Sequence, residues 1–220
     1  MPDNAKQNST IEKLLKEKIV VIVRGVEKGK LIPLAEALYT GGIRFLEVTY
    51  SANGSVSDEA TAESIKALAD NFRGRMHIGA GTVLTEKQVE LTAKAGGEFI
   101  ISPDTDPSVI KKTKELGLIS MPGALTPSEI KAAHFAGADF VKLFPISSLG
   151  TDYVKAVTAP LSNVRLLAVG GINLDNMREY LSKGVCGFGI GTNITDKKLI
   201  DENNFDGITA LAEKYVAVVK

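Results

Sequence analysis

Residues 140–161 read FVKLFPISSLGTDYVKAVTAPL, a short apolar run followed by an amphipathic stretch. The run FVKLFP has the length and apolar character of a buried β-strand. In TDYVKAVTAPL the apolar residues recur every three or four positions, which is the period of a helix with one buried face. This stretch is therefore predicted to form one strand-then-helix unit.

The same order recurs along the chain. Apolar, β-branched runs predict eight strands, and an amphipathic stretch follows each of them. The runs are continuous, as expected for parallel strands that are covered by helices. An opening helix is expected near Thr10–Lys16. The predicted strands are IVVIVRGV (19–26), FLEVTY (45–50), HIGAGTV (77–83), FIIS (99–102), LISMPG (118–123), FVKLFP (140–145), LLAVGG (166–171) and GFGIGT (187–192).

Eight such units at a spacing of about 20 to 30 residues favour an α/β fold, a (β/α)₈ TIM barrel with an extra N-terminal helix. A doubly wound open sheet is the alternative. That fold normally has a glycine-rich nucleotide loop after its first strand, and VIVRGVEKGK offers none. No linker-like composition shift divides the sequence, so a single domain over residues 1–220 is expected.

Composition narrows the class of protein. The 26 basic and 26 acidic residues cancel, which gives no electrostatic reason to expect nucleic acid or a membrane surface as a partner. A single cysteine, Cys186, excludes an intrachain disulfide and fits a reducing compartment. The N-terminal MPDNAKQNST lacks an apolar core, and no run reaches the roughly 20 apolar residues of a membrane helix. A cytoplasmic protein is expected.

Two charged residues stand inside apolar strand runs. Lys142 in FVKLFP has two interpretations: its stem packs on apolar neighbours while its head reaches solvent, or burial lowers its pKa and makes it a nucleophile. Glu47 in FLEVTY is either half of a structural salt bridge or a general acid/base that faces Lys142 across the barrel. Functional groups of a TIM barrel lie at the C-terminal ends of its strands, where Lys142 is expected.

Glycines end the last two predicted strands, at Gly170-Gly171 and at Gly191-Thr192. In isolation they fit any tight turn between a strand and a helix. In a TIM barrel the loops after strands seven and eight often bind phosphate, and glycines allow an anion to reach backbone N–H groups. This position favours a phosphate site.

Two further polar residues stand near the C-terminal ends of predicted strands. Thr82 in GAGTV and Arg24 in VRGV are either structural or suited to a substrate carboxylate. His77 begins a strand and His134 lies in a predicted helix, and neither is given a role. The acidic and histidine residues show no metal-ligand spacing, so no metal is expected.

Together these motifs resemble the bacterial aldolases for 2-keto-3-deoxy-6-phosphogluconate and 4-hydroxy-2-oxoglutarate, including their relatives that act on the galactonate epimer. The resemblance runs along nearly the whole chain. It is carried, in order, by IVRG, GGIRFLEVT, GAGTVL, FIISP, MPGALTPSE, KLFP, AVGGI and GIGT.

The resemblance implies a class I, pyruvate-dependent aldolase, a lyase that needs no metal or other cofactor and is commonly a homotrimer. Lys142 would form a Schiff base with the 2-keto group, and Glu47 would move protons through a water. The substrate would be a small keto acid or sugar-acid phosphate, and the products pyruvate plus glyceraldehyde 3-phosphate, or glyoxylate from the hydroxyoxoglutarate.

The resemblance also implies two binding sites. One holds the pyruvyl carboxylate and consists of Thr82, the Gly79–Gly81 backbone including Gly81, and Arg24. The other holds the distal phosphate and consists of Gly170, Gly171, Gly191 and Thr192.

Two departures leave the C4 epimer of the substrate open. Many gluconate-type members have an arginine at the position of Ser51, and Arg24 is expected to take over its role. Many also have threonine at the position of Val169, whereas galactonate-type members more often have valine there. A phosphate-binding isomerase or synthase without covalent catalysis, and a non-catalytic sugar-phosphate sensor, remain as alternative functions.

Overall fold

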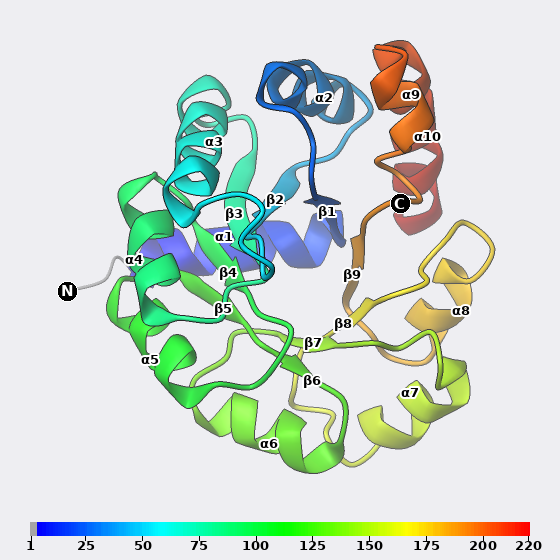
Figure 1. The fold of residues 1–220 in the computed structure, drawn as a ribbon. Helices are drawn as coiled ribbons and strands as arrows, with labels where there is room; N and C mark the ends of the chain where they lie inside the picture. The colour runs from blue at the N-terminus through cyan, green and yellow to red at the C-terminus, as the bar shows by residue number, and fades with distance from the viewer. Residues whose placement is uncertain (1–3) are drawn as a thin grey trace.

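The computed structural model describes residues 4–220, so residues 1–3 of the domain predicted over 1–220 lie outside the described residues. Helices surround a central parallel sheet (Figure 1). The strands are β1 Ile19–Val23, β2 Phe45–Thr49, β3 His77–Gly81, β4 Phe99–Ile101, β5 Ile119–Met121, β6 Gly123–Ala124, β7 Val141–Leu143, β8 Leu166–Val169 and β9 Gly187–Ile190. The helices are α1 Asn4–Glu17, α2 Lys28–Thr40, α3 Asp58–Asn71, α4 Glu86–Lys94, α5 Pro107–Glu115, α6 Pro127–Phe135, α7 Gly150–Thr158, α8 Met177–Ser182, α9 Lys197–Asp201 and α10 Phe205–Val219.

The sheet is the predicted (β/α)₈ barrel with its fifth strand divided in two. Its strand order is β5-β4-β3-β2-β1-β9-β8-β7-β6, with every pairing parallel. The predicted strand 118–123 is interrupted at Pro122, which has no N–H for the ladder. Its first half, β5, pairs with β4, and its second half, β6, pairs with β7. The two halves of one run therefore complete the ring.

Side chains alternate between the inside and the outside of the barrel, because successive residues of a strand face opposite ways. On β2, Leu46 and Val48 point outward into the core between sheet and helices, while Phe45 points inward. The same alternation turns Glu47 inward. On β7, Phe140 and Lys142 face inward and Val141 and Leu143 outward.

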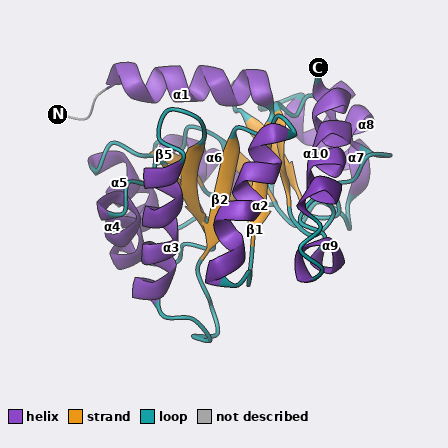
Figure 2. Cartoon of the chain, turned by 90° about the horizontal axis from the view of Figure 1, so that it is seen from above, coloured by secondary structure: helices purple, strands orange, loops and turns teal. Residues whose placement is uncertain are grey.

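The opening helix is longer than predicted and closes one end of the barrel. Helix α1 lies across the N-terminal ends of the strands (Figure 2). Its Ile11 and Leu14 are buried in the same cluster as Val20, Phe45 and Phe140. Burying a side chain of this size contributes about 1.5–3 kcal/mol. The C-terminal ends of the strands are left as the open face.

Hydrogen bonds between residues close together in the chain shape the loops at that open face. Thr126 and Glu129 form a capping box at the start of α6. Thr85 caps α4 by accepting from the Gln88 N–H, but the Gln88 side chain accepts from Leu84 N instead of closing the box on Thr85. Helix α9 was not expected, because its five residues are too few to show a helical period. No helix within residues 4–220 combines the length and apolar character needed to cross a bilayer.

Candidate active site

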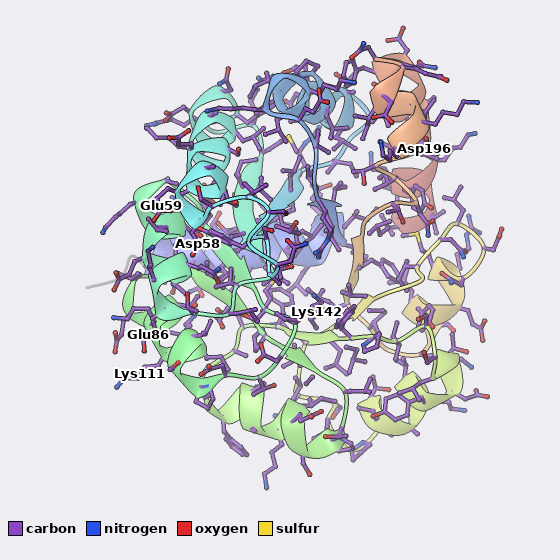
Figure 3. The ribbon with its side chains drawn as sticks, in the orientation of Figure 1. Asp58, Glu59, Glu86, Lys111, Lys142 and Asp196 are labelled. Atoms are coloured by element: carbon purple, nitrogen blue, oxygen red, sulfur yellow. The ribbon has the colours of Figure 1, made fainter. Side chains whose placement is uncertain are left out.

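Glu47 and Lys142, which come from opposite parts of the sequence, line one small pocket inside the barrel. Lys142 lies on β7 within the ring of helices (Figure 3). The pocket encloses a cavity of about 10 Å³, which is the space that one water molecule needs. Its walls are otherwise almost wholly apolar, formed by Val20, Ile22, Ile101, Leu167, Val169, Phe188 and Gly189.

The Lys142 amine is held in a poorly solvated position. The residue is 8% exposed. Burial lowers the pKa of its amine, the nearby positive charge of Arg24 lowers it further, and the Glu47 carboxylate opposes both effects. The ammonium lies 4.4 Å from the ring centroid of Phe144. Sequence reasoning missed this contact, although Phe144 is two residues from Lys142 and so falls on the same side of the strand.

Glu47 is more deeply buried, at 2% exposed. Its Oε2 has no hydrogen-bond partner among the described residues. Burial raises the pKa of its carboxyl to about 7, against the opposing attraction of Lys142 and Arg24. An acid with such a pKa exchanges protons readily near neutral pH, as a general acid/base requires. The alternative interpretation, a structural salt bridge, is not supported, since no ion pair within 4.0 Å joins Glu47 to a described cation.

Room for the Glu47 carboxylate is made on the neighbouring strand. Glu47 is paired in register with Gly79, and Gly81 follows on the same face. A Cβ added at Gly81 would lie 2.0 Å from Glu47 Oε1. Any larger residue at this position must displace the carboxylate. The sequence suggested Gly81 as a backbone donor, and the structure shows in addition that its missing side chain matters.

Thr82 and Arg24, which the resemblance assigns to one carboxylate site, lie in contact with each other. Arg24 Nη2 donates to Thr82 Oγ1 over 3.1 Å. Thr82 lies just beyond the end of β3 and has φ 55, so it is outside the strand predicted for residues 77–83. A left-handed conformation at a β-branched residue costs on the order of 1–3 kcal/mol and is found where the surrounding structure enforces it. The hydroxyl and guanidinium together suit a carboxylate.

Arg24 also separates two larger cavities at the open face. One, of about 390 Å³, lies between the loops that follow β1 and β2 and includes Ser51. The other, of about 230 Å³, includes Gly191 and Thr192. Arg24 therefore lines one cavity with Ser51, the position of the missing arginine, and the other with residues of the predicted phosphate loop.

The two predicted phosphate loops follow neighbouring strands, β8 and β9. Gly170 and Gly171 have φ of 102 and 71, in the left-handed region. A Cβ at Gly171 would lie 2.7 Å from the Cβ of Ser147 in the loop after β7. Asn193 Nδ2 donates to the carbonyl of Ile172 over 2.7 Å, which ties the two loops together. Ser147 and Asn193 were not singled out from the sequence, because no short motif marks them.

The remaining candidates have structural surroundings. His77 stacks on Phe45 at 4.7 Å between ring centroids, and its Nδ1 lies 2.6 Å from Glu98 Oε2. Burial raises the pKa of the Cys186 thiol to about 11, the opposite of what a reactive cysteine needs. Within the described part of the chain, no three His, Cys, Asp or Glu side chains gather as a metal site would require.

Known proteins share this arrangement of strands and sequence. Residues 10–211 match the family model for KDPG and KHG aldolase. The 2-dehydro-3-deoxy-phosphogluconate aldolase of Haemophilus influenzae is 34% identical over 214 residues, which cover 96% of this chain and 96% of that protein. The 2-dehydro-3-deoxy-6-phosphogalactonate aldolase of Escherichia coli is 31% identical over 177 residues, which cover 80% of this chain and 83% of that protein.

Solved structures agree with the sequence match. The KDPG aldolase of Legionella pneumophila, with pyruvate captured at low pH as a covalent carbinolamine intermediate, has a TM-score of 0.82 and 29% identity, covering 91% of this chain and 94% of that chain. A native KDPGal structure has a TM-score of 0.81 and 29% identity, covering 91% of this chain and 95% of that chain.

Proposed function

This chain belongs to the KDPG and KHG aldolase family and is an aldolase, and we propose that it works as a class I enzyme through a Schiff base on Lys142. We propose as substrates 2-dehydro-3-deoxy-6-phosphogluconate, its galactonate epimer, or 4-hydroxy-2-oxoglutarate. The products would be pyruvate and glyceraldehyde 3-phosphate, or glyoxylate. The observation that carries the proposal is the pairing of an amine of lowered pKa with a carboxyl of raised pKa in one apolar pocket.

In the proposed reaction, neutral Lys142 Nζ attacks the C2 carbonyl of the keto acid. The carbinolamine then loses water to give a protonated imine. Burial of the amine supports this step, because it lowers the pKa and so increases the fraction of neutral nucleophile near pH 7. The Legionella relative, in which pyruvate was captured as a carbinolamine, adds support.

Glu47 is proposed to move the protons. Its carboxylate takes the proton of the C4 hydroxyl, the C3–C4 bond breaks, and the bonding electrons pass to the imine, which becomes an enamine as the aldehyde leaves. The protonated Glu47 then returns the proton to C3, and water hydrolyses the imine to release pyruvate. The small cavity beside Glu47 and Lys142 gives a water room to relay these protons.

The two ends of the substrate would be held by two separate groups of residues. We propose that Arg24, Thr82 and the backbone at Gly81 hold the pyruvyl carboxylate, supported by the Arg24–Thr82 hydrogen bond. The loops after β8 and β9 would hold the distal phosphate, supported by their adjacency and by Asn193. The proposed phosphate residues are Gly170, Gly171, Gly191 and Thr192.

The substrate epimer is proposed to depend on Val169. This side chain lines the pocket with Lys142 and presents methyl groups where a hydroxyl would contact the C4 substituent. Ser51 carries no charge, so Arg24, which shares a cavity with it, supplies the guanidinium on that side. We further propose one aldolase domain over residues 1–220, assembled as a cytoplasmic homotrimer. The trimer can be tested by sedimentation equilibrium.

The test of the Schiff base is incubation with pyruvate, reduction with borohydride and peptide mass spectrometry. We expect a reduced pyruvyl adduct on Lys142 and none on the exposed Lys131, which serves as an internal control. Lys142→Ala should lose both the adduct and retro-aldol cleavage. Absence of an adduct on Lys142 would falsify the covalent mechanism and return the non-covalent isomerase and the sugar-phosphate sensor as alternatives.

A further inference from the structure

Gln88 connects the loop after β3 to the start of helix α3 through its largely buried side-chain amide. It is the third residue of α4 and is 8% exposed. Its Oε1 accepts from Leu84 N over 2.8 Å, in the loop after β3, and its Nε2 donates to Asp58 Oδ1 over 3.0 Å, at the start of α3. Asp58 and Glu86, labelled in Figure 3, mark the starts of α3 and α4 on one side of the barrel.

The backbone of Gln88 is fixed as firmly as its side chain. Its carbonyl accepts from Tyr50 Oη over 3.2 Å and from Thr92 Oγ1 over 2.8 Å. Tyr50 is 1% and Thr92 0% exposed. The Tyr50 N–H in turn donates to the Gly81 carbonyl at the end of β3. Gln88 is therefore held through both its side chain and its backbone carbonyl, and the Tyr50 and Thr92 contacts to that carbonyl are buried.

Thr82 lies at the end of this network. The residues between β3 and the helix cap Thr85 are only Thr82, Val83 and Leu84. Val83 is buried and donates to the Ile101 carbonyl, and the Gln88 side chain holds Leu84. With both following residues fixed, the chain is constrained to turn at Thr82, which adopts the left-handed conformation and directs its hydroxyl to Arg24.

We propose that Gln88 is a positioning residue of the aldolase reaction. By holding Leu84 against the start of α3, it keeps the Thr82 hydroxyl and the Arg24 guanidinium placed for the carboxylate of the keto acid. This role rests on the proposed function, in which Thr82 and Arg24 bind that carboxylate. Gln88 itself touches neither Lys142 nor Glu47 and takes no part in proton transfer.

The chain contains a matched comparison at the same helical position of α6. Glu129 accepts from Leu125 N over 2.9 Å and from Thr126 N over 2.8 Å. Unlike Gln88, it is exposed, and its hydrogen bonds stay within the start of its own helix. Removing either side chain takes away hydrogen bonds to the residues just before its helix, but only Gln88 links the loop after β3 to another helix, α3.

The experiment measures the pyruvate concentration that gives half-maximal borohydride trapping on Lys142. In Gln88→Leu we expect this concentration to rise about tenfold, while trapping at saturating pyruvate stays complete, because the site is misplaced and the amine is untouched. For retro-aldol cleavage we expect KM to rise by a similar factor and kcat to change little. Glu129→Leu should lower the melting temperature without changing the half-saturation.

A rescue variant separates positioning from loss of stability. Gln88→Glu keeps an acceptor for Leu84 N but sets two carboxylates together, and it should raise the half-saturation. Adding Asp58→Asn restores a donor to the introduced carboxylate and should return the half-saturation to the wild-type value. An unchanged half-saturation in Gln88→Leu, or a double variant no better than Gln88→Glu, overturns the positioning role. If no pyruvate is trapped on the wild-type protein, the proposed Schiff-base function is refuted, and the positioning role is refuted with it.

Discussion

The Glu47 carboxylate lies against Gly81 on the neighbouring strand, so closely that a Cβ at that glycine would be 2.0 Å from Oε1. The contact joins the proposed proton carrier to the strand that leads to Thr82. Because the glycine is inside a strand and the carboxylate is fully buried, neither can move aside cheaply. The absence of a side chain at residue 81 is therefore part of the site.

Gly81→Ala tests this contact. The added methyl group should push Glu47 from its position and lower kcat by about 100-fold, since misplacing a catalytic group by about 1 Å has an effect of this size. Pyruvate should still be trapped on Lys142. Gly29→Ala is the control, because a Cβ there meets nothing within 4 Å. Normal turnover in Gly81→Ala would show that Glu47 has no fixed position in the reaction.

The pH dependence of cleavage should report the ionisation of Glu47. The carboxylate form accepts the C4 proton, so kcat/KM should rise with pH through a limb near 7, where the pKa of Glu47 lies. Glu47→Gln should lower kcat by roughly 10²–10⁴-fold and remove that limb. Steady-state rates between pH 5 and pH 9 measure both effects. The same limb in Glu47→Gln would assign it to another group.

Glu47 should also make the folded protein less stable as the pH rises. Its pKa is raised from 4.5 to about 7, so between these values the folded state holds a proton that the unfolded state has lost. The stabilisation is complete below pH 4.5 and is lost as the pH rises through 7. The free energy of unfolding of Glu47→Gln should therefore exceed that of wild type by about 3 kcal/mol at pH 8 and by little at pH 4. Urea unfolding at the two pH values measures this difference. If the stability difference between the two proteins instead grew toward low pH, burial would not be raising the pKa of Glu47.

Val169→Thr tests the substrate epimer. The substitution keeps the side-chain shape and adds one hydroxyl to the pocket that Lys142 shares. The ratio of kcat/KM for the gluconate and galactonate substrates should shift toward the gluconate by about tenfold or more, because a pocket hydroxyl discriminates through its hydrogen bond. If the ratio stays the same in the two proteins, Val169 does not select the epimer.

The two central residues of the site were predictable from the sequence because each breaks a local rule. Glu47 and Lys142 are charges inside apolar strand runs, and period-two alternation then fixes the side of the barrel that each faces. Arg24 and Thr82 were singled out by their place at the ends of predicted strands, and the structure brings the two side chains together. For these four residues, the sequence signal lies in the residue itself and in its near neighbours in the chain.

The parts that escaped prediction depend on distant partners. The Gln88 network takes its members from the loops after β2 and β3 and from helices α3 and α4, and no short motif joins them. The contact between Gly81 and Glu47 depends on the register between β2 and β3, and no sequence motif reveals that register. The division of the fifth strand had a signal in Pro122, but its consequence, that the halves pair with different neighbours, follows only from closing the ring.

Helix α1, which closes the N-terminal end of the barrel, has a consequence for how reactants would enter and leave. In the proposed cleavage, substrate and products would all pass through the open face, and the pyruvyl part would stay attached to Lys142 until the imine is hydrolysed. For the proposed cleavage the aldehyde therefore leaves first and pyruvate last. Pyruvate would then bind the free enzyme and inhibit competitively against the substrate, while the aldehyde would inhibit noncompetitively. The Schiff base would thus set the order of release, and α1 would leave both products a single exit.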